Sequence, residues 1–171
     1  MSSLLLNAST KNLLLQSSDR YMNMASFDAL PALMKDLTVF VTTTTQIENL
    51  FRNRSQDTWE MAEHLCSLGC QYVIMLDDAY GQCLVDGRLR KHFQLPAYPV
   101  SIVDPTGMQE AFCGGFLTGI KKNYDPIEAM LYGNVSASLT AEGTGPFFCM
   151  DAIPGLIDSR LKFARELVKS I

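Results

Sequence analysis

The residues best placed to do chemistry lie in one stretch, residues 104–116, which reads DPTGMQEAFCGGF. Gly107 in this stretch forms a tight turn between an expected strand at residues 100–103 and an expected helix at residues 110–121. Backbone N–H groups at the start of a helix point outward, and the helix dipole adds partial positive charge, so an anion binds well there. The stretch therefore predicts a phosphate or carboxylate site. The alternative is an ordinary strand-to-helix turn whose glycines serve packing alone.

The elements that must position this turn alternate along the chain. Apolar, β-branched segments predict strands, and apolar residues at helical spacing predict amphipathic helices. Asp86 and Gly87 form the expected turn of a hairpin, and Asp125 with Pro126 is typical of a helix start. We expect strands at residues 13–15, 37–41, 72–76, 82–85 and 88–93, and helices at residues 26–35 (capped by Ser26), 47–51, 58–68, 125–139 and 153–170.

This alternation predicts an α/β fold with a mostly parallel sheet and an antiparallel hairpin at one edge. The chain has 171 residues, so we expect a single domain, residues 1–171. Apolar residues make up 47% and charged residues 19%, which excludes a disordered chain.

The charge pattern and hydropathy narrow the function classes. A net charge of −4 without a basic cluster argues against a nucleic-acid partner. No apolar run approaches the roughly 18 residues that a membrane helix needs. We expect a soluble, cytoplasmic protein with neither a nucleic-acid nor a membrane partner.

Residues 104–116 resemble the second signature of the ribokinase-like carbohydrate kinases, the PfkB family. The pattern there reads Asp-Thr/Pro-Thr-Gly-Ala-Gly-Asp-x-Phe-x-Gly-Gly-Phe. The order of segments from about residue 13 to residue 161 is also similar to the C-terminal half of that family. The resemblance implies a three-layer α/β/α ribokinase-like fold, truncated, in which the sugar-binding and lid portion of the family is absent.

The resemblance also implies roles for individual residues in the signature. The family's last signature aspartate is the general base for the sugar hydroxyl, and its position here holds Glu110. The backbone of Gly107, Met108 and Gln109 corresponds to the anion hole, and Thr106 to a nucleotide-binding position. Glu110 moves the carboxylate by one methylene, and Gln109 adds a side chain where glycine left room. A carboxylate in the first helical turn is also favoured by the dipole alone, so a structural role for Glu110 stays open.

Three further positions carry the resemblance outside the signature. Residues 78–81, Asp-Ala-Tyr-Gly, stand where the family has a Gly-x-x-Gly turn near the nucleotide, which makes Asp78 and Gly81 nucleotide-binding candidates. Asn134 corresponds to a helix asparagine that faces the nucleotide base; it could equally bond a local backbone group. Gln46 ends a Thr-Thr-Thr-Gln segment where the family has a metal-organising glutamate, so we expect weakened Mg²⁺ binding. Residues 42–45 otherwise predict a strand end rather than a phosphate cradle.

The altered positions suggest a family member with impaired or lost catalysis, a pseudokinase that serves as a binding or structural subunit and retains some affinity for ATP and Mg²⁺. One alternative is an active ATP-dependent sugar kinase completed by an N-terminal half or partner chain. Another is a regulatory nucleotide sensor. Missing sheet strands would leave an open edge, so a homo-oligomer or a complex with another chain is expected.

Overall fold

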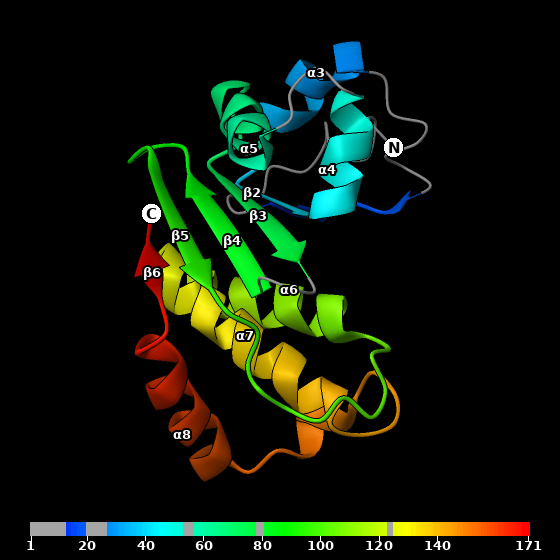
Figure 1. Cartoon of the computed structure of the whole chain (residues 1–171), viewed down its shortest axis with the longest axis vertical. Coiled ribbons are helices and arrows are strands. Elements are labelled where there is room, and N and C mark those ends of the chain that lie inside the picture. The colour runs from blue at the N-terminus through cyan, green and yellow to red at the C-terminus, as the bar shows by residue number, and fades with distance from the viewer. Residues whose placement is uncertain (1–12, 20–26, 53–56, 78–80, 123–124) are drawn as a thin grey trace. The chain divides into compact units, whose positions relative to one another are not determined.

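The computed structural model of the chain describes residues 13–19, 27–52, 57–77, 81–122 and 125–171. The chain divides into two compact units. Unit 1 comprises Met1–Met75 and Leu84–Lys91, and unit 2 comprises Leu76–Cys83 and His92–Ile171. Figure 1 shows the elements of both units, coloured from blue at the N-terminus to red at the C-terminus.

The strands form a six-stranded sheet in the order β1-β2-β3-β4-β5-β6. β1 runs parallel to β2, with Leu14 opposite Val39, and β5 runs antiparallel to β6, with Phe93 opposite Ser170. The sheet is therefore mixed, and the prediction of an α/β fold is confirmed. The strands are β1 (Leu14–Gln16), β2 (Val39–Thr43), β3 (Tyr72–Asp77), β4 (Gly81–Asp86), β5 (Lys91–Leu95) and β6 (Lys169–Ser170).

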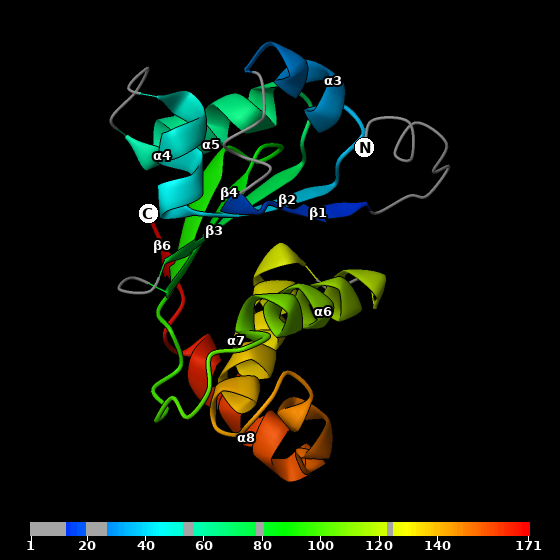
Figure 2. The ribbon, with the colours of Figure 1, turned by 90° about the vertical axis from the view of Figure 1, so that its right-hand side faces the viewer.

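Unit 1 packs short helices against β1 and β2 (Figure 2). Phe40 on β2 is fully buried, as are Ile47 and Leu65 on the helices that cover it. Side chains cap both longer helices: Thr43 caps α4 and Asp57 caps α5. The helices in the described part of this unit are η1 (Phe27–Ala29), α3 (Leu30–Met34), α4 (Thr44–Phe51) and α5 (Thr58–Ser67).

Unit 2 is built around the close pair α6 (Met108–Lys121) and α7 (Pro126–Ala141), with η2 (Phe148–Asp151) and α8 (Pro154–Arg165) after them. A Cβ on Gly115 would lie 2.5 Å from the Tyr132 carbonyl oxygen, and one on Gly119 would lie 2.6 Å from the Ala129 Cα. These glycines let the two helix backbones approach. The cap expected at Asp125 is confirmed, since its carboxylate accepts from the Glu128 N–H at 2.9 Å.

The strand expected at residues 100–103 is wrong, because this segment is not paired as a strand. Prolines at 96, 99 and 105 bring no N–H group, which interrupts ladder bonding on either side of the segment. Val103 instead donates its N–H to the Ala141 carbonyl at the end of α7, at 2.7 Å. A looped segment fixed to a helix end therefore leads into α6.

Several other boundaries differ from expectation. The hairpin turn spans residues 87–90 rather than two residues, because Asp86 accepts from the N–H groups of Arg88 and Leu89 and holds a longer turn. Arg90 ends that turn with φ 52°. The last helix stops at Arg165, and Lys169–Ser170 pairs with β5 as an added strand that periodicity did not indicate. Ser26, the expected cap of the first helix, lies outside the described residues, and α3 begins after Ala29.

Among the helices within the described ranges, none is both long and apolar enough to cross a membrane.

Candidate functional site

The signature turn forms as a glycine-capped helix start. Gly107 is the N-cap of α6 and adopts φ 84°, ψ 2°, a left-handed conformation that favours glycine. The Met108 N–H bonds to the Pro105 carbonyl at 3.2 Å, and the Ala111 N–H bonds to the Gly107 carbonyl at 2.8 Å. Glycine has no side chain with which to cap the first turn, so the helix start stays without a side-chain cap.

The turn is held by Asp104, a residue that the sequence analysis did not single out. One carboxylate oxygen accepts from the Thr106 N–H at 3.0 Å, and the other accepts from the Gly145 N–H at 2.9 Å. The hydrogen bond from the Thr106 side chain, followed by these backbone bonds, lowers the pKa of Asp104. The signal was available, because an aspartate two residues before a threonine favours such a local turn.

A second loop packs directly on the glycine. A Cβ added to Gly107 would lie 2.5 Å from the Pro146 Cβ and 2.8 Å from its Cα. Asp104 fixes that loop through Gly145. Gly107 is therefore required by its own conformation and by the adjacent loop, whatever else it binds.

Glu110 and Gln109 both lie exposed in the first turn of α6. The Glu110 charge reaches the buried thiol one turn later: burial, then the nearby Glu110 carboxylate, raises the pKa of Cys113 to about 12. Thr106 is exposed as well, and Met108 is half-buried. The predicted anion-hole residues thus surround one solvent-facing helix start.

Gly81 and Asn134 come together elsewhere in unit 2. A Cβ on Gly81, whose φ is 83°, would lie 2.3 Å from the Leu95 carbonyl oxygen and 2.4 Å from the Ala97 nitrogen. The Asn134 amide Nδ2 donates to the Gln82 Oε1 at 2.6 Å and to the Pro96 carbonyl at 3.1 Å. Neither partner is local, since Gln82 lies 52 and Pro96 38 positions away in the sequence. Its Oδ1 is buried and has no hydrogen-bond partner in the described part of the chain. Asp78 lies outside the described residues.

Gln46 lies in unit 1 and is 7% exposed. Its Oε1 accepts from the Ser17 hydroxyl at 2.5 Å and from the Thr43 N–H at 3.2 Å, and its Nε2 donates to the Asp19 Oδ1 at 2.8 Å. Thr42 and Thr43 end β2, as predicted, whereas Thr44 and Thr45 belong to α4, which Thr43 caps. Asp19 had no sequence signal, because its role depends on contact with a residue 27 positions later.

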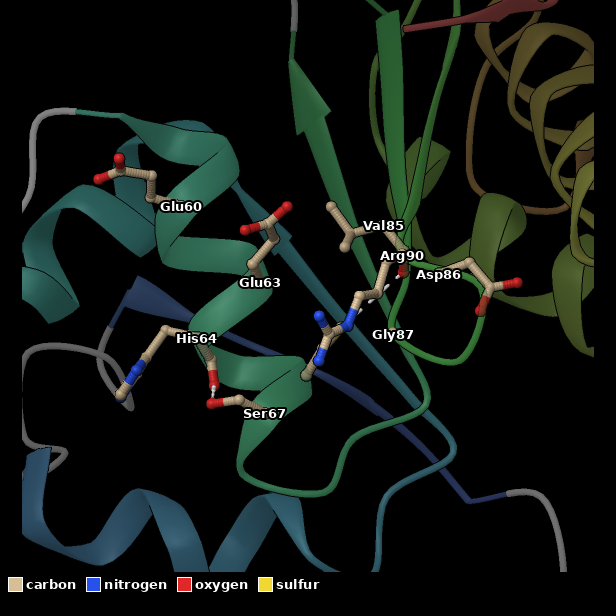
Figure 3. Close-up of a pocket in the computed structure, with 9 residues that line it drawn as sticks. Glu60, Glu63, His64, Ser67, Val85, Asp86, Gly87 and Arg90 are labelled. Carbon is tan, nitrogen blue, oxygen red and sulfur yellow. Dashed lines mark hydrogen bonds between the residues drawn. The ribbon is translucent and has the colours of Figure 1, made fainter.

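A pocket of about 390 Å³ lies in unit 1 between α5 and the β4–β5 turn (Figure 3). Glu60, Glu63 and His64 line it from the helix, and Asp86 and Arg90 line it from the turn. None of the residues predicted from the signature belongs to its lining.

Residues 7–153 match the protein family described as pfkB family carbohydrate kinase. The chain belongs to the pfkB family of carbohydrate kinases. It is similar in sequence to a cytidine kinase of Thermococcus kodakarensis, with 36% identity over 75 residues, which is 44% of this chain and 27% of the relative.

Solved ribokinase-like structures share the pfkB fold seen here. The ribokinase of Thermotoga maritima matches with TM-score 0.76 and 18% identity over 94% of this chain and 52% of the ribokinase. A protein from E. coli described as a ribokinase II, in complex with ATP and Mg²⁺, matches with TM-score 0.65 and 20% identity over 80% of this chain and 42% of that one. The chain thus spans about half the length of these solved relatives.

The pfkB relatives imply ATP and Mg²⁺. The start of α6 and the surroundings of Gln46 fit these two groups differently. The start of α6 suits a phosphate, because its first turn has no side-chain cap and Thr106, Gln109 and Glu110 face solvent. The surroundings of Gln46 do not suit Mg²⁺, because the Gln46 side chain is a neutral amide whose oxygen and nitrogen are both hydrogen-bonded.

Proposed function

We propose that this pfkB-family chain is a catalytically impaired kinase homologue that binds a nucleotide weakly and acts as a binding or structural subunit. The observation that carries the proposal is the start of α6. The signature glycine is kept as the helix cap, while Gln109 and Glu110, which stand where the signature has the glycine and the catalytic aspartate, are exposed.

The kept parts support binding. A left-handed glycine ahead of a 14-residue helix presents backbone N–H groups and the positive end of the dipole to solvent. The carboxylate of Asp104 uses both oxygens to hold the turn, so its negative charge is engaged by backbone donors. These features favour the phosphate groups of a nucleotide.

The changed parts support impaired catalysis. A general base must lie within hydrogen-bond reach of the proton that it removes. The extra methylene of Glu110 shifts its carboxylate, and a shift of about 1 Å can cost on the order of a hundredfold in rate. Gln109 adds a side chain next to the proposed phosphate position at the start of α6. This side chain further disfavours an ordered transition state.

Turnover measurements test the catalytic part. The full chain with ATP, Mg²⁺ and a panel of sugars and nucleosides is expected to give no ADP above background. Glu110→Gln, which removes the carboxylate, is the matched control and is expected to give the same background. Turnover by the wild-type chain that Glu110→Gln abolishes would contradict impaired catalysis.

A second candidate is an active ATP-dependent sugar or nucleoside kinase completed by another segment. The observation in its favour is that the chain spans 52% of the Thermotoga maritima ribokinase. In this candidate Glu110 takes the proton from a hydroxyl and the N–H groups of residues 107–110 hold the transferred phosphate. It predicts that a longer polypeptide containing this chain turns over ATP, and that Glu110→Gln abolishes this turnover. No gain of activity in that product from Gln109→Gly with Glu110→Asp would reject it.

We further propose that another protein surface, from a second copy or a different chain, covers apolar side chains of unit 2. The exposed fractions are 73% for Phe147, 78% for Met150 and 68% for Ile153, and Ile102 and Val103 exceed 60%. Exposed apolar groups of this size favour association. Light scattering at micromolar concentration tests self-association, which Met150→Ser with Ile153→Ser is expected to reduce. A monodisperse wild-type monomer would contradict self-association.

A further inference from the structure

Hydrogen bonds gather around Gln46, where β1 and β2 end and α4 begins. Gln46 is the third residue of α4, and its side chain turns back to the N-cap residue Thr43. The Thr43 hydroxyl accepts from the Gln46 N–H at 3.2 Å, and the Thr43 N–H donates to the Gln46 Oε1 at 3.2 Å. This reciprocal arrangement is a capping box, in which glutamine or glutamate serves equally well.

The buried surroundings add a second set of requirements. The Ser17 hydroxyl donates to the Gln46 Oε1 at 2.5 Å and the Thr42 hydroxyl to the same oxygen at 3.4 Å. Ser17 is 5% exposed and Thr42 is 2% exposed. The Oε1 position therefore has to be an acceptor, and the backbone N–H of Thr43 fixes this because it can only donate.

The other side of the amide faces a carboxylate. The Gln46 Nε2 donates to the Asp19 Oδ1 at 2.8 Å. A glutamate in the same position would keep the contacts to Thr43 but would place its second oxygen against Asp19. Two carboxylate oxygens at that distance repel unless a proton or a cation lies between them. The neighbourhood thus requires an acceptor on one side and a donor on the other, which an amide supplies.

We propose that Asp19 and Gln46 form a hydrogen-bonded carboxylate–amide latch that ties the segment after β1 to the start of α4. In this chain the latch replaces the divalent-cation site that a carboxylate at position 46 would help to organise. The residue that resembles a degenerate metal position is thus a matched partner of Asp19. The proposal stands whether or not α6 binds a nucleotide, because unit 1 residues alone carry it.

Exchanging the donor and acceptor tests the latch in the full chain. Gln46→Glu is expected to lower Tm by roughly 2–4 °C at neutral pH, since it opposes two carboxylates. Asp19→Asn is expected to change Tm by less than about 2 °C, because an asparagine can still offer its oxygen to Gln46. The double variant carrying both changes restores a donor opposite an acceptor and is expected to recover most of the loss.

The outcomes separate cleanly. If Gln46→Glu does not fold and the double variant does, the latch is supported. If Gln46→Glu is as stable as the wild type, or if Asp19→Asn does not rescue it, the latch is overturned.

A magnesium titration tests the second half of the proposal. Millimolar MgCl₂ is expected to leave the Tm of the wild-type chain unchanged, since no carboxylate at position 46 faces Asp19. A rise in the wild-type Tm that Gln46→Ala removes would overturn the proposal. This readout needs no turnover, so its failure is distinguishable from failure of the proposed function.

Discussion

The starts of α4 and α6 make an informative pair, because in each helix the third residue departs from the kinase pattern that the sequence resembles. Gln46 follows the N-cap Thr43, and Glu110 follows the N-cap Gly107. Gln46 is buried and bonded on both sides of its amide, whereas Glu110 is exposed. The N-cap residue makes the difference. A threonine hydroxyl closes the first turn onto the third residue, while glycine leaves the turn open.

The contrast suggests a structural role for the α4 start and a binding role for the α6 start. The α4 start is built from side chains that satisfy one another, so little is left for a ligand. The α6 start is built from backbone and is fixed from behind by Asp104 and Pro146, so its front stays available.

Gly107→Ala is expected to cost about 3 kcal/mol, from the left-handed φ and the overlap with Pro146. Urea unfolding measures the loss. Gly114→Ala is the matched control, because its Cβ meets no atom within 4 Å and alanine favours a helix interior by about 0.5–1 kcal/mol. Equal effects of the two substitutions would show that the turn does not depend on Gly107.

Gln46→Ala is expected to lower the free energy of unfolding by about 1–3 kcal/mol, because the part-buried Thr43 N–H loses its acceptor and the buried Ser17 hydroxyl keeps only the Val41 carbonyl. Gln109 is an exposed glutamine in the first turn of α6. The free energy of unfolding of Gln109→Ala is expected to stay within about 0.5 kcal/mol of the wild-type value. Chemical denaturation of both variants checks this. A smaller loss for Gln46→Ala than for Gln109→Ala would contradict the account of the α4 start as closed by side chains and the α6 start as open.

Asp104→Asn tests whether the Asp104 carboxylate stabilises the turn before α6. The folded-state pKa of Asp104 is lowered, so the ionised form contributes stability above the unfolded value of 3.8, and this stability is lost as the pH falls through the folded-state pKa. The variant is therefore expected to be less stable than the wild type at neutral pH, with the difference vanishing in strong acid. Thermal unfolding across this pH range measures it. A difference that persists unchanged in acid would contradict the role of the charge.

Glu110→Gln is expected to have the smallest structural effect, a change in the chemistry of Cys113. Burial is the larger cause of the raised pKa of this thiol, and the Glu110 charge adds to it. Removing the charge lowers the pKa of Cys113 and speeds alkylation at alkaline pH. Cys70, whose pKa is raised by burial and by Cys66, serves as the internal control. An unchanged rate at Cys113 would place the Glu110 carboxylate farther from the thiol.

The sequence predicted much of the fold because the signals were local. Asp125 followed by Pro126 marked the start of α7, and the apolar residues at 72–76 marked β3. The glycine turn at 107 was predicted because left-handed geometry has a strong residue preference.

The missed features depend on contacts between distant residues. Asp19 meets Gln46 across 27 positions, and Asp104 meets Gly145 across 41. The segment at 100–103 has the composition of a strand, yet Val103 bonds the end of α7. Lys169–Ser170 pairs as a strand only because β5 offers an edge. No periodicity in the sequence carries such information.

Calorimetric titration of ATP with Mg²⁺ into the wild-type chain and into Glu110→Gln tests the central claim most directly. If the start of α6 is an open phosphate site with an unproductive carboxylate beside it, both proteins bind, and removing that negative charge tightens Kd by roughly 3–10-fold. Absence of binding heat and of any thermal shift in both proteins would contradict the account.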